Sequence, residues 1–371
     1  MASTKKRVAK QRVIVKVGTN TLNGPLDRPD PWYMAALADE ICDLADAGHD
    51  VILVTSGAIG TGRQILGIVE KPRDVRVRQA CAAVGQPRLM ESWASAFGRR
   101  NRHVGQVLLT YHTFASRESY LHMREAMRKL LEMGIVPIVN ENDAVSIAEI
   151  DAGFGDNDKL SALVASKMEA DLLVILSDVA GLYTKPPGTP GAQLVPLVED
   201  VDDSIRAMAG AKTSSGGRGG MGSKLDAAAL AMENGCAVVI TSGREPHVLR
   251  RVVSGETLGT RFAPRSREKG ARRWLLLARA EGEVHVDAGA ARAIADGKHL
   301  LPAGVVDVRG TFDVESVVSI VSGGKPVARA VSELSSADLA RVKGLHTPEA
   351  RALLGVEGAV NVTAKGKLLL L

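Results

Sequence analysis

The sequence predicts an α/β protein, a three-layer sandwich on a mainly parallel sheet, followed by a small β-rich domain. Over about the first 262 residues, short β-branched runs alternate with stretches of helical periodicity, as in strand–helix–strand units with parallel strands. After a charged break at 263–273, the apolar runs shorten and glycine turns separate them. We therefore expect two domains, at 1–262 and 274–371, joined by a linker at 263–273.

The composition limits the kinds of protein this chain can be. Its 371 residues exceed one ordinary domain, and a hydrophobic content of 45% is enough for a sizeable core. Aromatic residues make up only 3% of the chain, so stacking of nucleic acid bases on aromatic side chains is not an obvious mode. The net charge of +5 is usually a property of solvated surface, although it can favour anionic ligands.

The cysteines and the hydropathy exclude several other classes. The three cysteines lie far apart, so neither a disulfide framework nor a paired-cysteine zinc site is indicated, and a reducing cytoplasm is expected. No apolar run is long enough for a secretory signal or a membrane span.

Six β-branched or apolar runs are predicted strands of the first domain, and the segments between them have helical spacing. The strands are expected at residues 12–17, 50–55, 103–109, 135–139, 172–176 and 237–241. The helices are expected at residues 30–47, 75–97, 117–133, 160–168, 201–209, 225–234 and 246–253. Gly48 and Gly134 follow two of these helices and are typical C-terminal stops.

The second domain is predicted from shorter runs separated by glycine turns. Its strands are expected at residues 274–278, 283–286, 305–309, 317–321 and 327–331, with two short helices at 288–295 and 335–341.

A lysine lies near the end of the first predicted strand. An unpaired buried charge is unfavourable, so Lys16 either extends to water or meets an anion at the carboxyl end of the strand.

Two further strand ends carry polar or small residues. Residues 56–62 form a small-residue turn that opens a helix, where free backbone N–H groups can bind an anion, although tight strand–helix packing explains the turn equally well. Residues 140–143 are polar and follow a strand, at the edge where open α/β sheets bind ligands, and a solvated turn is the alternative.

The stretch 153–161 combines two carboxylates and an amide with a following helical run. Asp156 or Asn157 could simply cap that helix. The alternative is that Asn157 and Asp158 bind a polar substrate and orient cations around a transferred phosphoryl group.

A glycine-rich loop ends at Lys224, and its five glycines within residues 216–222 let the backbone approach a ligand closely. The loop is not a Walker A motif, because Ser223 separates Gly222 from Lys224. Dinucleotide-binding, protein-kinase, serine-hydrolase and zinc-helix motifs are also absent. Phosphoryl transfer fits best, since it mainly requires positioning and charge neutralisation.

Seven segments together resemble a known family. They are residues 15–19, 54–59, 83–86, 139–144, 155–158, 178–184 and 219–224. In this order they resemble the bacterial glutamate 5-kinases, which belong to the amino-acid kinase superfamily, and the C-terminal part is similar to the PUA domain that many members carry. The resemblance implies the amino-acid kinase fold and ATP-dependent phosphorylation of the side-chain carboxylate of L-glutamate, the first step towards proline.

The resemblance also implies roles for residues. Lys16 and Lys224 would neutralise charge on the moving phosphoryl group, and Asp158 would hold both lysines. Glutamate would be bound by Ser56, Asp143 and Asn157. ATP would be bound by Lys16, Ser177, Asp178, Arg218, Gly219, Gly220, Met221, Gly222, Ser223 and Lys224.

The resemblance further implies Mg²⁺ between the phosphates, with protein ligands that the sequence does not assign. A homo-oligomer, either a dimer or a tetramer, and feedback inhibition by proline are expected on the same basis.

Two alternatives stay open. Another amino-acid kinase could act on aspartate, acetylglutamate, carbamate or a nucleotide. The chain could instead bind RNA through its PUA domain, with phosphate contacts from a basic cluster that could also be a solvated linker. That cluster is Arg265, Arg267, Lys269, Arg272 and Arg273.

Overall fold

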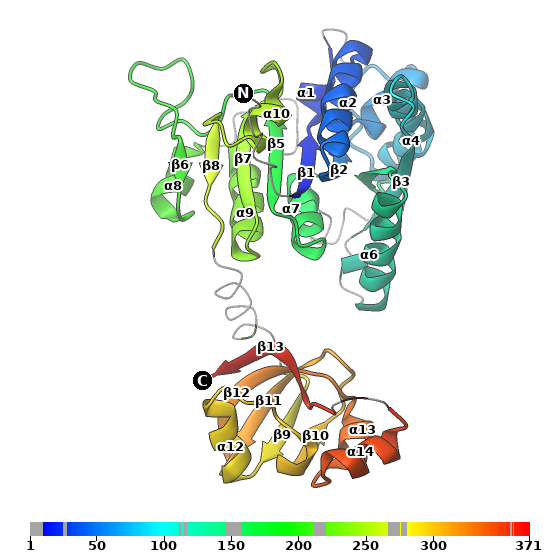
Figure 1. Ribbon diagram of the computed structural model, residues 1–371. Helices are drawn as coiled ribbons and strands as arrows, with labels where there is room; N and C mark the ends of the chain where they lie inside the picture. The colour runs from blue at the N-terminus through cyan, green and yellow to red at the C-terminus, as the bar shows by residue number, and fades with distance from the viewer. Residues whose placement is uncertain are drawn as a thin grey trace, which may run out of the picture. The chain divides into compact units, whose positions relative to one another are not determined.

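The computed structural model divides the chain into two compact units, Met1–Arg265 and Ser266–Leu371 (Figure 1). It describes residues 10–24, 28–110, 113–114, 117–145, 157–210, 220–265, 275, 280–356, 358 and 360–371.

The first unit is built on one eight-stranded sheet with the order β3-β4-β2-β1-β5-β7-β8-β6. Neighbouring strands are parallel except for β7 and β8, which pair antiparallel. The strands are β1 (Arg12–Val17), β2 (Asp50–Thr55), β3 (Val104–Leu109), β4 (Val136–Glu141), β5 (Leu172–Ser177), β6 (Leu197–Val198), β7 (Ala237–Ser242) and β8 (Thr260–Phe262). The predicted mainly parallel α/β sheet is therefore confirmed.

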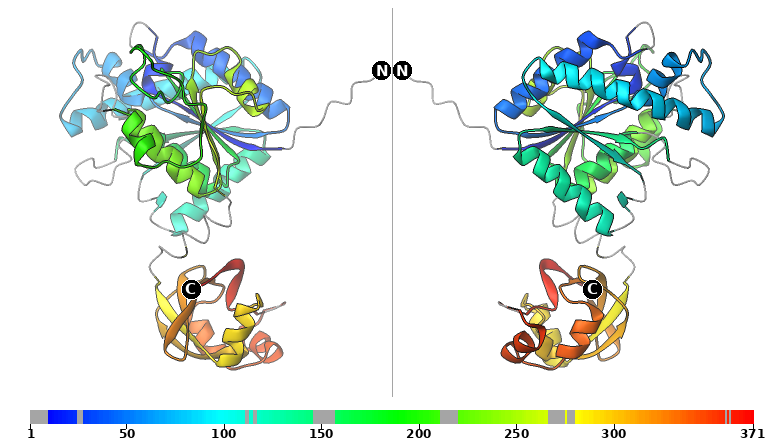
Figure 2. Two further views of the ribbon diagram at one scale, coloured as in Figure 1. Left: turned by 90° about the vertical axis from the view of Figure 1, so that its left-hand side faces the viewer. Right: turned by 90° about the vertical axis from the view of Figure 1, so that its right-hand side faces the viewer.

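Helices cover both faces of this sheet (Figure 2). They are α1 (Thr19–Leu22), α2 (Pro31–Asp46), α3 (Ala58–Ile65), α4 (Val75–Gly98), α6 (Arg117–Glu132), α7 (Asn157–Lys167), α8 (Asp203–Met208), α9 (Met221–Glu233) and α10 (Val248–Val253). One apolar core lies between the sheet and α2, α4 and α10, and a second lies between the sheet and α6, α7 and α9.

The alternation of side chains along β1 decides where its lysine points. Val13, Val15 and Val17 belong to the core beside α2, whereas Ile14 belongs to the core beside α7 and α9. Because successive side chains of a strand face opposite sides of the sheet, Lys16 faces the same side as Ile14. This places its ammonium group on the side of the sheet that α7 and α9 cover.

Where helices α3 and α4 cross, a glycine of each helix packs directly against the backbone of the other. A Cβ atom on Gly85 would lie 2.0 Å from the carbonyl oxygen of Ala58, and one on Gly62 would lie 1.8 Å from the carbonyl oxygen of Cys81. Both distances are far inside van der Waals contact, so only glycine allows this approach. The crossing holds the beginning of α3 against the middle of α4.

The second unit is a five-stranded sheet with the order β10-β9-β11-β12-β13. Its elements are β9 (Gly282–Val286), α12 (Ala288–Ala295), the 3₁₀ turn η1 (Pro302–Gly304), β10 (Val305–Gly310), β11 (Val317–Ser322), β12 (Lys325–Ser332), α13 (Ser336–Val342), α14 (Thr347–Leu354) and β13 (Thr363–Leu370). Strands and helices share a separate apolar core, so the predicted β-rich character of this part is confirmed.

The predicted boundary between the domains is only partly visible. Ala263 donates a backbone hydrogen bond to Val198, and Arg265 donates one to Met232, so the first residues of the predicted linker are attached to the first unit. Residues 266–274 lie outside the described part of the chain, as does the predicted strand at 274–278 except for Leu275. The linker therefore stays a prediction. Among the helices that the structure describes, none combines the length and the apolarity that crossing a membrane requires.

The crossing of α3 and α4 yields a stability prediction. Gly85→Ala should lower the free energy of unfolding by about 1–3 kcal/mol, because the added methyl group forces the two backbones apart. Urea unfolding of the variant and the parent measures this difference. Gly98→Ala is the matched control near the end of α4, since a Cβ atom there meets nothing within 4 Å. Equal stability of Gly85→Ala and the parent would contradict this account of the crossing.

Candidate active site

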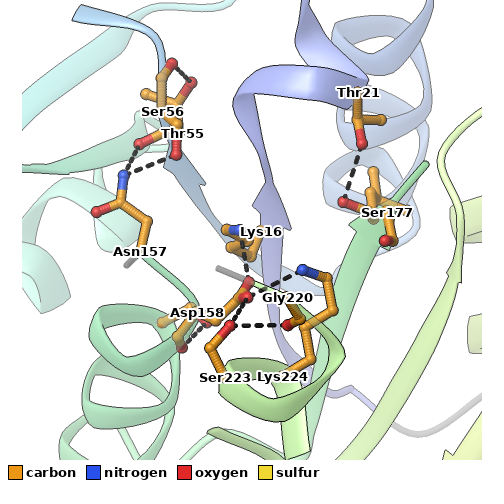
Figure 3. A network of polar contacts seen from close by, with 12 residues as sticks. Lys16, Thr21, Thr55, Ser56, Asn157, Asp158, Ser177, Gly220, Ser223 and Lys224 are labelled. Carbon is orange, nitrogen blue, oxygen red and sulfur yellow. Dashed lines mark hydrogen bonds and ion pairs between the residues drawn. The ribbon is translucent and has the colours of Figure 1, made fainter. Parts of the chain in front are cut away.

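Two lysines meet at one buried carboxylate (Figure 3). Lys16 Nζ lies 2.5 Å from Asp158 Oδ1, and Lys224 Nζ lies 3.1 Å from Asp158 Oδ2. The side chains of Lys16 and Asp158 are 3% and 0% exposed, and that of Lys224 is 11% exposed. Of the two alternatives for Lys16, exposure to water is therefore wrong, because its ammonium is buried and paired.

Three elements that are distant in the sequence bring these groups together. Lys16 is near the end of β1, Asp158 is the second residue of α7, and Lys224 lies in the first turn of α9. A carboxylate in the first turn of a helix also interacts favourably with the helix dipole. Gly18 leaves room beside the cluster, since a Cβ atom there would lie 3.3 Å from Lys16 Nζ.

The charges of this cluster favour an anionic ligand. Two ammonium groups and one carboxylate together carry a net positive charge in a largely buried position, where an added anion is strongly favoured. Helix α9 begins beside them at Met221, and its N-cap residue, Gly220, supplies no side-chain cap. Backbone N–H groups at such a helix start can bind phosphate.

Ser223 has a contact that the sequence does not reveal. Its hydroxyl lies 3.1 Å from Asp158 Oδ2 and 2.9 Å from the carbonyl oxygen of Gly220. Both of these atoms are acceptors, so they share the single hydroxyl hydrogen of Ser223, and one of the two is the carboxylate that holds the lysines. The side chain of Ser223 thus supports Asp158, while its predicted contact with ATP stays a prediction.

A second polar cluster lies at the ends of β2 and β4. Asn157 Nδ2 donates to the carbonyl oxygen of Thr55 at 2.7 Å, to Ser56 Oγ at 2.9 Å and to Asn140 Oδ1 at 2.9 Å. Two predicted substrate residues, Ser56 and Asn157, are therefore in direct contact. Asn140 was not among them, although it belongs to the polar stretch 140–143, and only the tertiary contact distinguishes it there.

Asn157 is not the N-cap residue of α7, so the capping alternative does not apply to it. Asn157 is the first residue of α7, and its amide group donates across to the end of β2. Asp156, the other proposed cap, lies outside the described residues.

Asp143 follows β4 and is half-buried. Burial raises the pKa of the Asp143 carboxyl to about 7, with a further upward contribution from Glu141 and an opposing one from Arg78. Among the described residues Asp143 forms no hydrogen bond with Ser56 or Asn157, so its predicted role in binding substrate is not tested by these contacts.

Ser177 and Asp178 lie at the end of β5. Ser177 Oγ donates to Asp178 Oδ1 at 3.2 Å, and Asn20 Nδ2 donates to Asp178 Oδ2 at 3.2 Å. Thr21 Oγ1 donates to the carbonyl oxygen of Leu176, which brings helix α1 beside the end of β5 (Figure 3). Both predicted nucleotide residues thus lie at the same edge of the sheet as Lys16.

The remaining predicted nucleotide residues belong to the glycine-rich loop. Gly220, Met221 and Gly222 form the start of α9. Arg218 and Gly219 lie outside the described residues. Within the described part of the chain, no group of three or more His, Cys, Asp or Glu side chains is arranged to hold a metal ion.

Comparisons with known proteins agree with this architecture. The amino acid kinase family matches residues 11–242, and the PUA domain matches residues 282–354. A carbamate kinase from Giardia lamblia bound to AMP-PNP has the same fold, with a TM-score of 0.51 and 17% identity over 69% of this chain and 99% of that chain.

Curated relatives match almost the whole chain. Glutamate 5-kinase from Methanosarcina mazei is 44% identical, covering 95% of this chain and 94% of that protein. The glutamate 5-kinases of Moorella thermoacetica and Meiothermus ruber are 43% and 45% identical, covering 97% and 93% of this chain and 96% and 92% of those proteins. This chain belongs to the amino acid kinase family and, within it, to the glutamate 5-kinases with a C-terminal PUA domain.

Proposed function

We propose that this protein transfers the terminal phosphoryl group of ATP to the side-chain carboxylate of L-glutamate. The observation that carries the proposal is the meeting of Lys16 and Lys224 at Asp158. The cluster lies at the carboxyl edge of a parallel sheet, between a helix start and a set of amide and hydroxyl groups. That edge is where open α/β sheets bind their ligands.

The reaction needs charge neutralisation more than acid–base chemistry. The attacking group, the glutamate carboxylate, is already ionised at neutral pH, so no general base is required. In the transition state, negative charge spreads over the oxygens of the moving phosphoryl group. Lys16 and Lys224 would stabilise that charge from two sides, and Asp158 would keep their ammonium groups in place before ATP arrives.

The nucleotide would occupy the edge beside β5 and α9. The residues fit a triphosphate, because two lysines and an uncapped helix start at Met221 supply donors for phosphate oxygens. Ser177 and Asp178 would hold the rest of the nucleotide. Mg²⁺, when bound with ATP, would neutralise phosphate charge, and such ions are held largely by substrate phosphates and water.

Glutamate would occupy the adjoining polar cluster. Asn157 and Ser56 are already hydrogen-bonded to each other at this edge. Gly57 precedes α3 at a φ of 113°, which favours glycine, and no side chain caps that helix. The backbone N–H groups at the start of α3 suit a substrate carboxylate, and the carboxylate of Asp143 suits the substrate ammonium.

The biological setting is proposed on the family resemblance. The reaction would be the first step of proline biosynthesis, proline would inhibit it, and the enzyme would be a homo-oligomer. A cytoplasmic location is supported by the three cysteines, all of which are buried and none of which forms a disulfide.

RNA binding through the second unit is the alternative from another class. Arg265, one residue of the basic cluster, is ion-paired with Asp200 and Glu233 of the first unit. The other four basic residues lie outside the described part of the chain. RNA affinity that falls steeply with salt and disappears on deletion of residues 264–371 would support this alternative.

One assay tests the proposed activity directly. MgATP should yield ADP rapidly in the presence of L-glutamate and not in its absence. Aspartate, acetylglutamate, carbamate and UMP serve as competing acceptors. Faster turnover with any of these acceptors would contradict the proposed substrate.

The lysine cluster yields a catalytic prediction. Lys16→Ala and Lys224→Ala should each lower kcat by about 100-fold, because each removes one preorganised cation from the transition state. Steady-state kinetics measure the loss. Lys129→Ala is the control, since Lys129 is a surface residue paired with Glu132. Near-normal turnover in Lys224→Ala would refute the role of Lys224.

The raised pKa of Asp143 yields a pH prediction. An ammonium binds the ionised carboxylate, which predominates above about pH 7 and is lost below it. The KM for glutamate should therefore rise about tenfold for each pH unit below 7, because in that range the substrate keeps its ammonium protonated and its carboxyl groups, with pKa values at or below about 4.3, ionised. Asp143→Asn should have a high KM that does not depend on pH. A pH-independent KM in the parent would contradict the contact.

Asp143 also yields a stability prediction: replacing it should weaken substrate binding without lowering the stability of the fold. Because its pKa is raised in the folded state, ionised Asp143 destabilises the fold above pH 7. Asp143→Asn should therefore have a Tm at pH 8 equal to or above that of the parent, although its KM is worse. A clear drop in Tm at pH 8 would indicate a structural role.

A further inference from the structure

Four amide side chains form a hydrogen-bonded row that begins in the candidate glutamate site. Asn157 Nδ2 donates to Asn140 Oδ1 at 2.9 Å, Asn140 Nδ2 donates to Gln86 Oε1 at 2.8 Å, and Gln86 Nε2 donates to Gln106 Oε1 at 3.0 Å. The four residues come from α7, β4, α4 and β3. Asn157, Asn140 and Gln86 are 8%, 2% and 8% exposed.

The direction of this row is fixed by the backbone. The carbonyl oxygen of Thr55 can only accept, so the atom of Asn157 that lies 2.7 Å from it is the amide nitrogen. The N–H group of Glu141 can only donate, and it donates to Asn140 Oδ1 at 2.9 Å. Asn140 must therefore present Nδ2 to Gln86, and Gln86 must present its oxygen to Asn140. The assignment of nitrogen and oxygen follows from these partners.

The fixed direction determines which atom Asn157 offers to a ligand. Its Nδ2 faces Thr55, Ser56 and Asn140, and its Oδ1 lies on the opposite side of the amide (Figure 3). An amide oxygen only accepts hydrogen bonds. The two carboxylates of L-glutamate also only accept at neutral pH, so the ammonium group is the one donor that this substrate can offer to Asn157 Oδ1.

Gln86 is held where it can support this arrangement. It follows Gly85, at which α4 touches the carbonyl oxygen of Ala58 in α3. The acceptor that Gln86 gives to Asn140 Nδ2 is buried. Without it, Asn140 would have an unsatisfied buried donor, which costs about 1–3 kcal/mol, and its amide would turn to find another partner. That turn would withdraw Asn140 Oδ1 from Asn157.

We propose that Gln86 is a positioning residue for the substrate ammonium, acting through Asn140 to keep Asn157 Oδ1 directed at it. This proposal rests on the proposed function, because it takes L-glutamate as the ligand of Asn157. Gln86 itself contacts Asn140 and Gln106. It would act on the substrate only indirectly, by strengthening the contact between Asn157 Oδ1 and the ammonium group.

The test compares glutamate with glutarate, which has the same two carboxylates and no ammonium. Gln86→Leu should raise the KM for glutamate about tenfold, the loss expected for one good hydrogen bond. The inhibition constant of glutarate against glutamate, and the KM for ATP, should change by less than about twofold, because neither ligand offers the ammonium. Gln86→Glu keeps an oxygen for Asn140 Nδ2 and should restore most of the affinity for glutamate.

The controls separate three outcomes. Gln86→Ala removes the same acceptor with less steric conflict and replaces Gln86→Leu where that variant fails to fold. Glu91→Leu, at an exposed position of α4, should leave all three constants unchanged. An unchanged glutamate KM in both removal variants, or an equal loss for glutamate and glutarate, would overturn the role of Gln86. A parent enzyme without glutamate-dependent ADP formation would instead refute the proposed function.

Discussion

The pairing of two lysines with one buried carboxylate is the interaction on which the rest of the site depends. Asp158 has no exposure to solvent, and an isolated carboxylate in that position would be strongly disfavoured. Lys16 and Lys224 make its burial tolerable, and in return Asp158 holds their ammonium groups within 3.1 Å of its two oxygens. Because the lysines belong to β1 and α9 and the carboxylate to α7, the pairing also ties both helices to the central strand.

Successive side chains of β1 face opposite sides of the sheet, and this alternation makes the ion pairing compatible with a stable core. Val13, Val15 and Val17 fill the core on one face, while Ile14 and Lys16 face α7 and α9. A charge is thus placed in the sheet without loss of apolar packing on the opposite face. Gly18 follows the last residue of β1, and a Cβ atom there would lie only 3.3 Å from Lys16 Nζ.

Two polar regions with different chemistry adjoin the lysines. On the side of β2 and β4, amide groups are linked into a row of fixed direction that leaves an oxygen of Asn157 to accept from a ligand. On the side of β5 and α9, an uncapped helix start and the lysines offer donors. The two proposed ligands differ correspondingly: the amino acid brings an ammonium group, which donates, whereas the triphosphate brings only acceptors. The division of the site thus matches its two proposed substrates.

The sequence by itself determined the fold class, most of the strands and helices of the first unit, and the segments that carry the site. Strong hydrophobic periodicity is a local property, so it can be recognised without knowledge of the neighbours. The two-residue and three-residue strands β6 and β8, and the C-terminal strand β13, were missed, because pairing with β8, β7 and β12 makes them strands. The contacts of Asn140 and Gln86, and the contact of Ser223 with Asp158, were likewise revealed only by the tertiary structure. Each depends on a hydrogen bond between elements that are distant in the sequence, and the direction of such a bond depends on groups that no local pattern reveals.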